Sequence, residues 1–399
     1  MGIWARITGR LGRDDLAKEI WRRVRALGLE GTLDLADLRI DLGERRHISL
    51  QNIWAEYQRG RSRAERRALI DHFTASIVET EEPTPATFDE ARPFLRPVVR
   101  ERAYYESVLL RVPPGLSPQP AVQSLGAHLT VAVALDRPSS MMEVWYQHLD
   151  GWKVTLDEAL DEAKKNLGRA SHSRWPETAP GVFASPFGDS YDAARAALPH
   201  VIGALPVRGD PVALVLSRNH LFVTGADDPA GIAALAHLGK MAAELPRAMS
   251  AFPVRWTDSA WEPLELPLAE PFRALHYEWT YRNYEEQRAA LERRGEGVRV
   301  APFRVFKNED GRLHSLTTWL AGEPNLLPRA DAVHVTRPDA PHDSPIVPWE
   351  RFVAILGRSL VAEPDRQLEL WRTPAEPAPE ILAELLAAAV GKATPSAPT

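Results

Sequence analysis

Two clusters of proline constrain the fold of this 399-residue chain more than any other feature of its sequence. The first lies within residues 112–120, VPPGLSPQP, and the second comprises Pro263, Pro267 and Pro271. Proline lacks a backbone N–H and interrupts both helices and central strands. A chain this long also exceeds the size at which one hydrophobic core stops growing. We therefore predict two or three domains, divided into a basic α+β region 1–112, an α/β region 121–262, an α+β region 271–390 and a disordered tail 391–399.

Composition places the chain among ordinary globular proteins. Hydrophobic residues make up 44% of the sequence and charged residues 26%, as in a typical packed domain. The longest apolar stretches, such as 129–135, have the length of a strand, far below the ~18 residues that cross a bilayer. The chain has no cysteine, which excludes disulfides, thiolate nucleophiles and cysteine-ligated metals. Because the N-terminal sequence also lacks a secretory signal pattern, we expect a cytoplasmic protein without a transmembrane segment.

Local patterns predict both helices and strands. Thr155 and Glu158 have the spacing of a capping box, in which each side chain binds the other's backbone N–H at the start of a helix. Apolar periodicity and capping signals predict helices over 14–27, 156–167, 191–198, 228–245 and 281–294. Continuous apolar runs predict buried strands at 129–135, 211–216 and 221–224, and alternation around Ala36 and Asp37 predicts a hairpin. We expect an α+β protein in which each domain has a small mixed sheet covered by helices.

The formal net charge of −6 is unevenly distributed along the chain. Residues 1–70 hold 15 Lys and Arg against 10 Asp and Glu, whereas the remainder holds 33 against 44. The acidic body argues against specific nucleic-acid binding, because phosphate contacts need a basic face. The densest basic cluster comprises Arg59, Arg61, Arg63, Arg66 and Arg67. The cluster is a candidate phosphate-binding site, but the favoured interpretation is the solvent-exposed start of a helix.

Known catalytic and cofactor motifs are absent from the sequence. It contains no Walker loop, no G-x-G-x-x-G, no G-x-S-x-G and no H-E-x-x-H. The histidines form no pair at i and i+4 on a predicted helix, and Asp227 with Asp228 has no further acid nearby to complete a hard-cation site. A helix cap is the favoured role for Asp228. We therefore expect no metal and no cofactor.

One short segment is a candidate ligand-binding site. Arg218, Asn219 and His220 lie between two predicted strands, where a guanidinium, an amide and an imidazole come together. Such a group suits an anionic ligand. A polar β-turn without a ligand is the competing interpretation and the favoured one, because Asn tolerates turn geometry.

The first residues of the chain form a possible amphipathic segment. Ile3, Trp4, Ile7 and Leu11 share one helical face. The segment either packs on the body of the protein or makes a peripheral contact with an anionic surface, of a membrane or of another protein. Glycines at positions 9 and 12 weaken a free helix, so we expect it to dock on the body.

A resemblance to a known family is carried by several short segments in a particular order. They are ISLQNIW at 48–54, RR at 66–67, LRPVVR at 95–100, AKKNL at 163–167, SYDAAR at 190–195 and the stretch from 212 to 225 that contains SRNH. Over residues 14–245 this order resembles the YtpQ-like family of bacterial proteins. That family has no established activity, so the resemblance implies no catalytic residue.

The function class is inferred mainly from the absence of known catalytic motifs in the sequence. Without a catalytic signature, and with twelve tryptophans and modules bounded by proline, the sequence favours a non-catalytic protein-interaction or regulatory protein whose partner is another protein. For the tryptophans, anchoring of the core is the default interpretation and an interaction surface is the alternative. The alternative function is an enzyme that acts on a phosphorylated or otherwise anionic small molecule, with Arg218 and His220 in its site.

Overall fold

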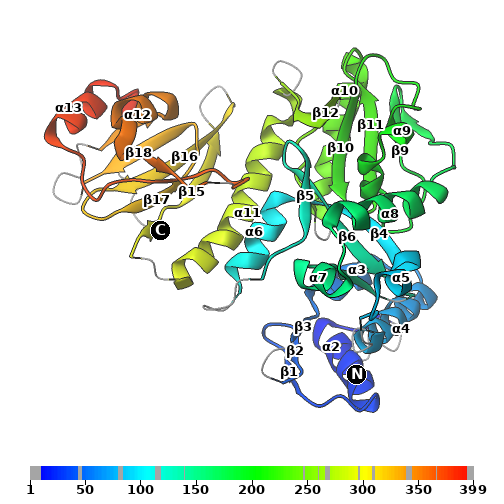
Figure 1. Ribbon diagram of the computed structural model, residues 1–399. Helices are drawn as coiled ribbons and strands as arrows, with labels where there is room; N and C mark the ends of the chain where they lie inside the picture. The colour runs from blue at the N-terminus through cyan, green and yellow to red at the C-terminus, as the bar shows by residue number, and fades with distance from the viewer. Residues whose placement is uncertain are drawn as a thin grey trace.

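The computed structural model describes most of the chain and confirms the predicted α+β class (Figure 1). The described residues are 10–43, 47–79, 84–112, 118–138, 140–245, 248–258, 260–265, 270–294, 297–307, 311–337, 344–364 and 366–392. Their strands form four sheets, of three, ten, four and five strands.

The N-terminal unit packs three helices around a small antiparallel sheet. The helices are α2 (Arg13–Ala26), α3 (Gln51–Arg59) and α4 (Arg63–Glu79), and the strands are β1 (Thr32–Asp34), β2 (Arg39–Asp41) and β3 (His47–Ser49). The predicted hairpin is present as β1 and β2, with Leu33 opposite Ile40. Ile20, Ile40 and Ile53 lie in the core of this unit. The helix predicted over 14–27 is confirmed as α2.

The central sheet has the order β4-β6-β5-β13-β12-β10-β11-β9-β8, with β7 on β6. Its strands are β4 (Leu95–Glu101), β5 (Val122–Gly126), β6 (Leu129–Asp136), β7 (Met141–Glu143), β8 (Glu177–Ala179), β9 (Val182–Ala184), β10 (Pro211–Ser217), β11 (His220–Gly225), β12 (Val254–Thr257) and β13 (Ala260–Pro263). Its two halves meet where β13 runs parallel to β5, at Trp261 and Gly126. Gly126 has φ +109°, and a Cβ there would lie 2.1 Å from the carbonyl oxygen of Trp261. Only glycine fits this junction.

Helices cover the central sheet and position its loops. They are α5 (Phe88–Ala91), α6 (Arg102–Leu110), α7 (Tyr146–Trp152), α8 (Leu156–Arg169), α9 (Pro199–Ile202) and α10 (Pro229–Gly239). Thr155 and Glu158 form the predicted capping box at the start of α8. Strand β4 precedes the proline cluster at 112–120 but pairs with β6, which follows it. The sheet therefore crosses the boundary predicted at residue 112.

The C-terminal unit contains two mixed sheets and is joined to the centre by a long helix. Helix α11 (Arg273–Arg294) begins eight residues before the predicted start at Tyr281 and packs against α6. One sheet comprises β14 (Arg299–Val300), β17 (Asn325–Pro328), β21 (Leu370–Arg372) and β20 (Val361–Ala362). The other comprises β15 (Phe303–Lys307), β16 (Leu313–Leu320), β18 (Ala332–Thr336), β19 (Pro345–Pro348) and β22 (Gly391–Lys392). Figure 1 shows α11 between the central sheet and these strands, with α12 (Trp349–Leu356) and α13 (Pro379–Ala387) on the far side.

Some local predictions differ from the structure. The single helix predicted over 191–198 is instead a 3-10 helix, Ala193–Ala197, followed by the short α9. Gly391 and Lys392, the first residues of the predicted disordered tail, pair with β19 as β22, while residues 393–399 lie outside the described part of the chain. Ile3, Trp4 and Ile7 also lie outside it. Leu11 is described, and it packs against the N-terminal core.

No helix in the described ranges is both long enough and apolar enough to cross a bilayer.

Candidate functional site

The structure places Arg218, Asn219 and His220 at the turn between β10 and β11. The hydroxyl of Ser217 is 2.8 Å from Nδ1 of His220 and accepts the backbone N–H of Asn219. Burial lowers the pKa of His220, and the nearby Asp192 carboxylate opposes this shift. The backbone therefore forms a polar turn, as the favoured interpretation of the sequence has it. Anion binding by the side chains of this turn stays a prediction.

A buried polar cluster lies next to this turn. The carbonyl of Arg218 accepts the backbone N–H of Ala193, which ties the turn to the SYDAAR segment. Oδ1 of Asp192 accepts the hydroxyl of Ser185 at 2.6 Å. Arg195 has no exposed surface and forms a bidentate ion pair with Asp189, at 3.0 and 2.8 Å. These charged residues hold the chain in place, so part of the resemblance to the YtpQ-like family rests on structural residues.

Two other groups singled out from the sequence have structural contacts. Asp228 caps α10 by accepting the backbone N–H of Gly231 at 3.1 Å, so the capping interpretation is confirmed. Arg66 of the basic cluster is buried, lies over the ring of Tyr57 and donates to the carbonyl of Gly60. The described residues contain no group of three or more His, Asp or Glu placed to hold a metal ion.

Most tryptophans with a described environment anchor the core, whereas Trp145 is less buried and borders a cavity. Six of them are buried: Trp152, Trp175, Trp261, Trp279, Trp319 and Trp349. Trp145 is only partly buried. It lies at the start of α7 and borders a cavity of 590 Å³, within the usual size range of ligand pockets.

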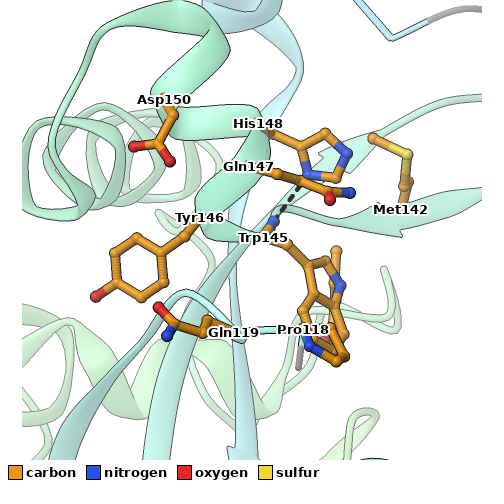
Figure 2. Close-up of a pocket in the computed structure, with 9 residues that line it drawn as sticks. Pro118, Gln119, Met142, Trp145, Tyr146, Gln147, His148 and Asp150 are labelled. Carbon is orange, nitrogen blue, oxygen red and sulfur yellow. Dashed lines mark hydrogen bonds between the residues drawn. The ribbon is translucent and has the colours of Figure 1, made fainter. Parts of the chain in front are cut away.

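This cavity, which we call the α7 groove, is lined by aromatic, amide and acidic side chains. Its lining residues are Pro118, Gln119, Met142, Glu143, Trp145, Tyr146, Gln147, His148 and Asp150. Figure 2 shows Tyr146 and Trp145 on opposite sides, with Gln119 between them and with His148 and Asp150 at the other end. The backbone N–H of Tyr146 donates to the carbonyl of Gln119 at 3.4 Å, which joins the two walls.

Helix α7 is held rigidly beneath the groove. Leu149 and Trp152 are buried in the central core, and the indole N–H of Trp152 donates to the carbonyl of Pro85 at 2.8 Å. The helix ends at Lys153, which adopts a left-handed conformation with φ 56°. Because its inner face is fixed, α7 presents Tyr146, Gln147 and Asp150 to solvent with little freedom to rearrange.

Two of the titratable groups that line the groove, His148 and Glu143, already have structural partners. Nδ1 of His148 accepts the backbone N–H of Trp145 at 2.9 Å. Burial lowers the pKa of His148, although this backbone contact opposes the shift. The carboxylate of Glu143 lies 3.1 Å from Arg100 and accepts the hydroxyl of Tyr105 at 3.3 Å. The groove therefore has more capacity to bind than to transfer protons.

The α7 groove is not among the sites predicted from the sequence. A signal for it was present, because WYQH at 145–148 places two aromatic rings, an amide and an imidazole in consecutive positions. Such a run at a helix start exposes several of its members, because side chains at successive positions do not share one face. Core anchoring, the default interpretation of a tryptophan near the end of an element, hid this signal at Trp145.

In comparisons with known proteins, no family model, no curated protein and no solved structure matches this chain. Its resemblance to the YtpQ-like family stays a prediction.

Proposed function

We propose that this protein is a non-catalytic interaction protein that binds an extended segment of a partner protein in the α7 groove. The observation that carries the proposal is the nature of the groove wall. Trp145 and Tyr146 line it on opposite sides, and the amides of Gln119 and Gln147 are also among its lining residues. Tyrosine and tryptophan are the residues that most often dominate binding energy at protein interfaces.

The polar groups of the groove match a peptide backbone. An extended peptide offers one N–H donor and one carbonyl acceptor at each residue other than proline, and a primary amide can satisfy both. Gln119 and Gln147 are both exposed and line the groove. The buried contacts of Leu149 and Trp152 hold the backbone of α7 in place, so binding there orders little backbone.

Charge favours a partner segment that is neutral or basic. Glu143 and Asp150 line the groove, and its described lining residues include no lysine or arginine. An anionic small molecule, the substrate class of the alternative function, would meet negative charge here. A lysine or arginine in the partner would instead face the exposed Asp150 carboxylate.

A cytoplasmic location and a bacterial origin belong to the same proposal. The first is supported by the absence of disulfides, which follows from the lack of cysteine and is usual for proteins of reducing compartments. The second is supported only by the resemblance of segments such as SYDAAR to YtpQ-like proteins.

Selection from a displayed library of random 12-residue peptides tests this proposal. We expect selected peptides to carry a lysine or arginine and to bind the intact protein. Replacing Tyr146 and Gln147 together with alanine should weaken their binding about tenfold or more, because both side chains are exposed at the groove and would contact the partner directly. Fluorescence anisotropy with labelled peptides gives the dissociation constants.

A matched control is Tyr281→Ala. Tyr281 is 48% exposed, close to the 39% of Tyr146, but lies on α11 and does not line the groove. Its removal should leave the affinities unchanged. If the groove variant binds the selected peptides as tightly as the intact protein, or if Tyr281→Ala loses binding equally, the α7 groove is not the binding surface.

A further inference from the structure

A second cavity lies where the central and C-terminal units meet, and it shares no lining residue with the α7 groove. We call it the junction cleft. It has a volume of 390 Å³ and is lined by Phe252, Leu264, Arg273, His276, Tyr277, Trp279, Thr280, Phe303, Ser315, Pro328, Arg329, Ala330, Asp331, Gln367, Leu368 and Glu369. The first turns of α11 form one wall, and the segment between β17 and β18 forms another.

One carboxylate in the cleft is held in a fixed orientation. Oδ2 of Asp331 accepts the hydroxyl of Tyr277 at 2.6 Å, and the backbone N–H and hydroxyl of Ser315 at 2.7 and 3.0 Å. Asp331 is nevertheless exposed. Burial and this hydrogen bond raise the pKa of Tyr277, which keeps its hydroxyl protonated as a donor to Asp331.

Aromatic rings line the same cleft as this carboxylate. Trp279 and Phe303 are buried parts of the cleft wall. His276 is accessible to solvent, and its ring lies 5.0 Å from Phe252 and is stacked on Trp279 at 6.5 Å. Rings beside an anchored carboxylate form the setting in which proteins bind organic cations.

Thr280 adds an unsatisfied acceptor to the cleft. Its side chain is only 8% exposed, and its Oγ1 has no hydrogen-bond partner within the described part of the chain. A buried hydroxyl without a partner is uncommon in folded proteins and calls for an explanation, of which a bound ligand is one. A primary ammonium has three N–H donors and no acceptor, which matches a hydroxyl oxygen and a carboxylate.

Arg329, one of the two arginines that line the cleft, already has acidic partners. It lies 3.1 Å from Glu369 and 3.2 Å from Glu350, so its charge is balanced by two acids. Glu369 itself lines the cleft. Asp331 is the carboxylate that hydrogen bonds from Tyr277 and Ser315 anchor in place.

We propose that the junction cleft binds a small organic cation, a primary ammonium on a short apolar stem. The ammonium binds Asp331 and Thr280, and the stem packs against Trp279 and His276. This site goes beyond the proposed function, because it takes a small molecule and uses other residues than the α7 groove.

Isothermal titration with n-butylammonium, 1-butanol and butyrate tests the proposal on the full chain. We expect n-butylammonium to bind at least tenfold more tightly than the neutral and anionic analogues. Asp331→Asn should reduce ammonium affinity about tenfold or more, because it removes the charge of a charge-assisted hydrogen bond. Equal affinity for butyrate, or full affinity in Asp331→Asn, would overturn the site.

Thr280→Val keeps the test decisive if Asp331→Asn folds poorly. Valine has the shape of threonine without the unpaired hydroxyl, so the melting temperature should stay the same or rise. We expect ammonium affinity to fall severalfold in this variant. Asp210→Asn is the control, because Asp210 pairs with Arg255 and neither residue lines the cleft. Unchanged affinity in Thr280→Val, or equal loss in Asp210→Asn, contradicts the proposal.

Discussion

Replacing Arg195 with alanine is expected to lower the free energy of unfolding by about 2–5 kcal/mol, the range for cutting back a large buried side chain. Arg195 is fully buried and donates to Asp189 through both terminal nitrogens and to the hydroxyl of Ser171 through Nε. Its guanidinium also lies 3.4 Å from the centre of the Phe187 ring. The substitution removes these contacts and leaves a large cavity, which adds to the loss. Chemical denaturation with the intact protein as reference measures the change.

The pKa of Asp189 gives a second readout of the same ion pair. Burial alone would raise this pKa, but the hydrogen bonds from Arg195 and from the backbone N–H of Tyr191 outweigh it and lower the pKa below its usual value. Arg195→Ala should therefore raise it. The control is Arg255→Ala, because Arg255 and Asp210 form a pair with both side chains more than 40% exposed. Such a pair is worth about 0–1 kcal/mol, so an equal loss in both variants would contradict the structural role of Arg195.

Replacing Glu101 with glutamine is expected to remove a pH-dependent contribution of about 3 kcal/mol to the free energy of unfolding. Glu101 is 4% exposed and lies behind the junction cleft. Its carboxylate accepts the backbone N–H of Ser250 at 2.9 Å, the indole N–H of Trp279 at 3.1 Å and the amide of Gln367 at 3.2 Å. Burial raises its pKa from 4.5 to about 7, because these hydrogen bonds compensate only part of the lost hydration.

The sign of the effect follows from the raised pKa. Between pH 4.5 and 7 the folded protein keeps Glu101 protonated, whereas the unfolded chain does not, so stability falls as the pH rises through this window. His128 acts in the opposite direction. Burial lowers its pKa to about 4, so its contribution rises with pH between 4 and its usual value of 6.5. The two contributions oppose each other in the intact protein.

Comparing Glu101→Gln with the intact protein separates the contribution of Glu101 from that of His128. Glutamine cannot ionise, so the stability of the intact protein relative to Glu101→Gln should fall by about 3 kcal/mol between about pH 4.5 and 7.5. Urea denaturation of both proteins across this range gives the difference. A difference that does not change with pH would mean that Glu101 titrates near its ordinary pKa.

Local sequence patterns were sufficient to predict the elements that depend on contacts between residues close together in the chain. The capping box at Thr155 and the cap at Asp228 are set by hydrogen bonds within four residues of chain. The strand predicted at 129–135 is a fully buried apolar run in the structure. Such features need no knowledge of distant contacts, because one turn or one face determines them.

Long-range contacts explain where the predictions from sequence are wrong. The helix predicted over 191–198 does not form because Asp192 binds the hydroxyl of Ser185 and two backbone N–H groups before it, while Arg195 reaches back to Asp189. Pairing of β4 with β6 across the proline cluster is likewise a contact between segments that are distant in sequence. Neither contact leaves a periodic pattern in the sequence.

The complete lining of each candidate site also depends on contacts between distant segments. The α7 groove joins Gln119 to residues 142–150, and the junction cleft joins Phe252 to Asp331 and Gln367. The role of Glu101 depends on Ser250, Trp279 and Gln367, which only the fold brings to it.

Photo-crosslinking in living cells tests the central claim, binding of a partner protein in the α7 groove, most directly. A benzophenone amino acid replaces Gln147, which is exposed in the groove, and in a second variant it replaces Tyr281 on α11. We expect a discrete crosslinked protein from position 147 that is absent from position 281 and is lost when Tyr146→Ala is added. No crosslinked protein at position 147, or the same product from both positions, would contradict binding in the groove.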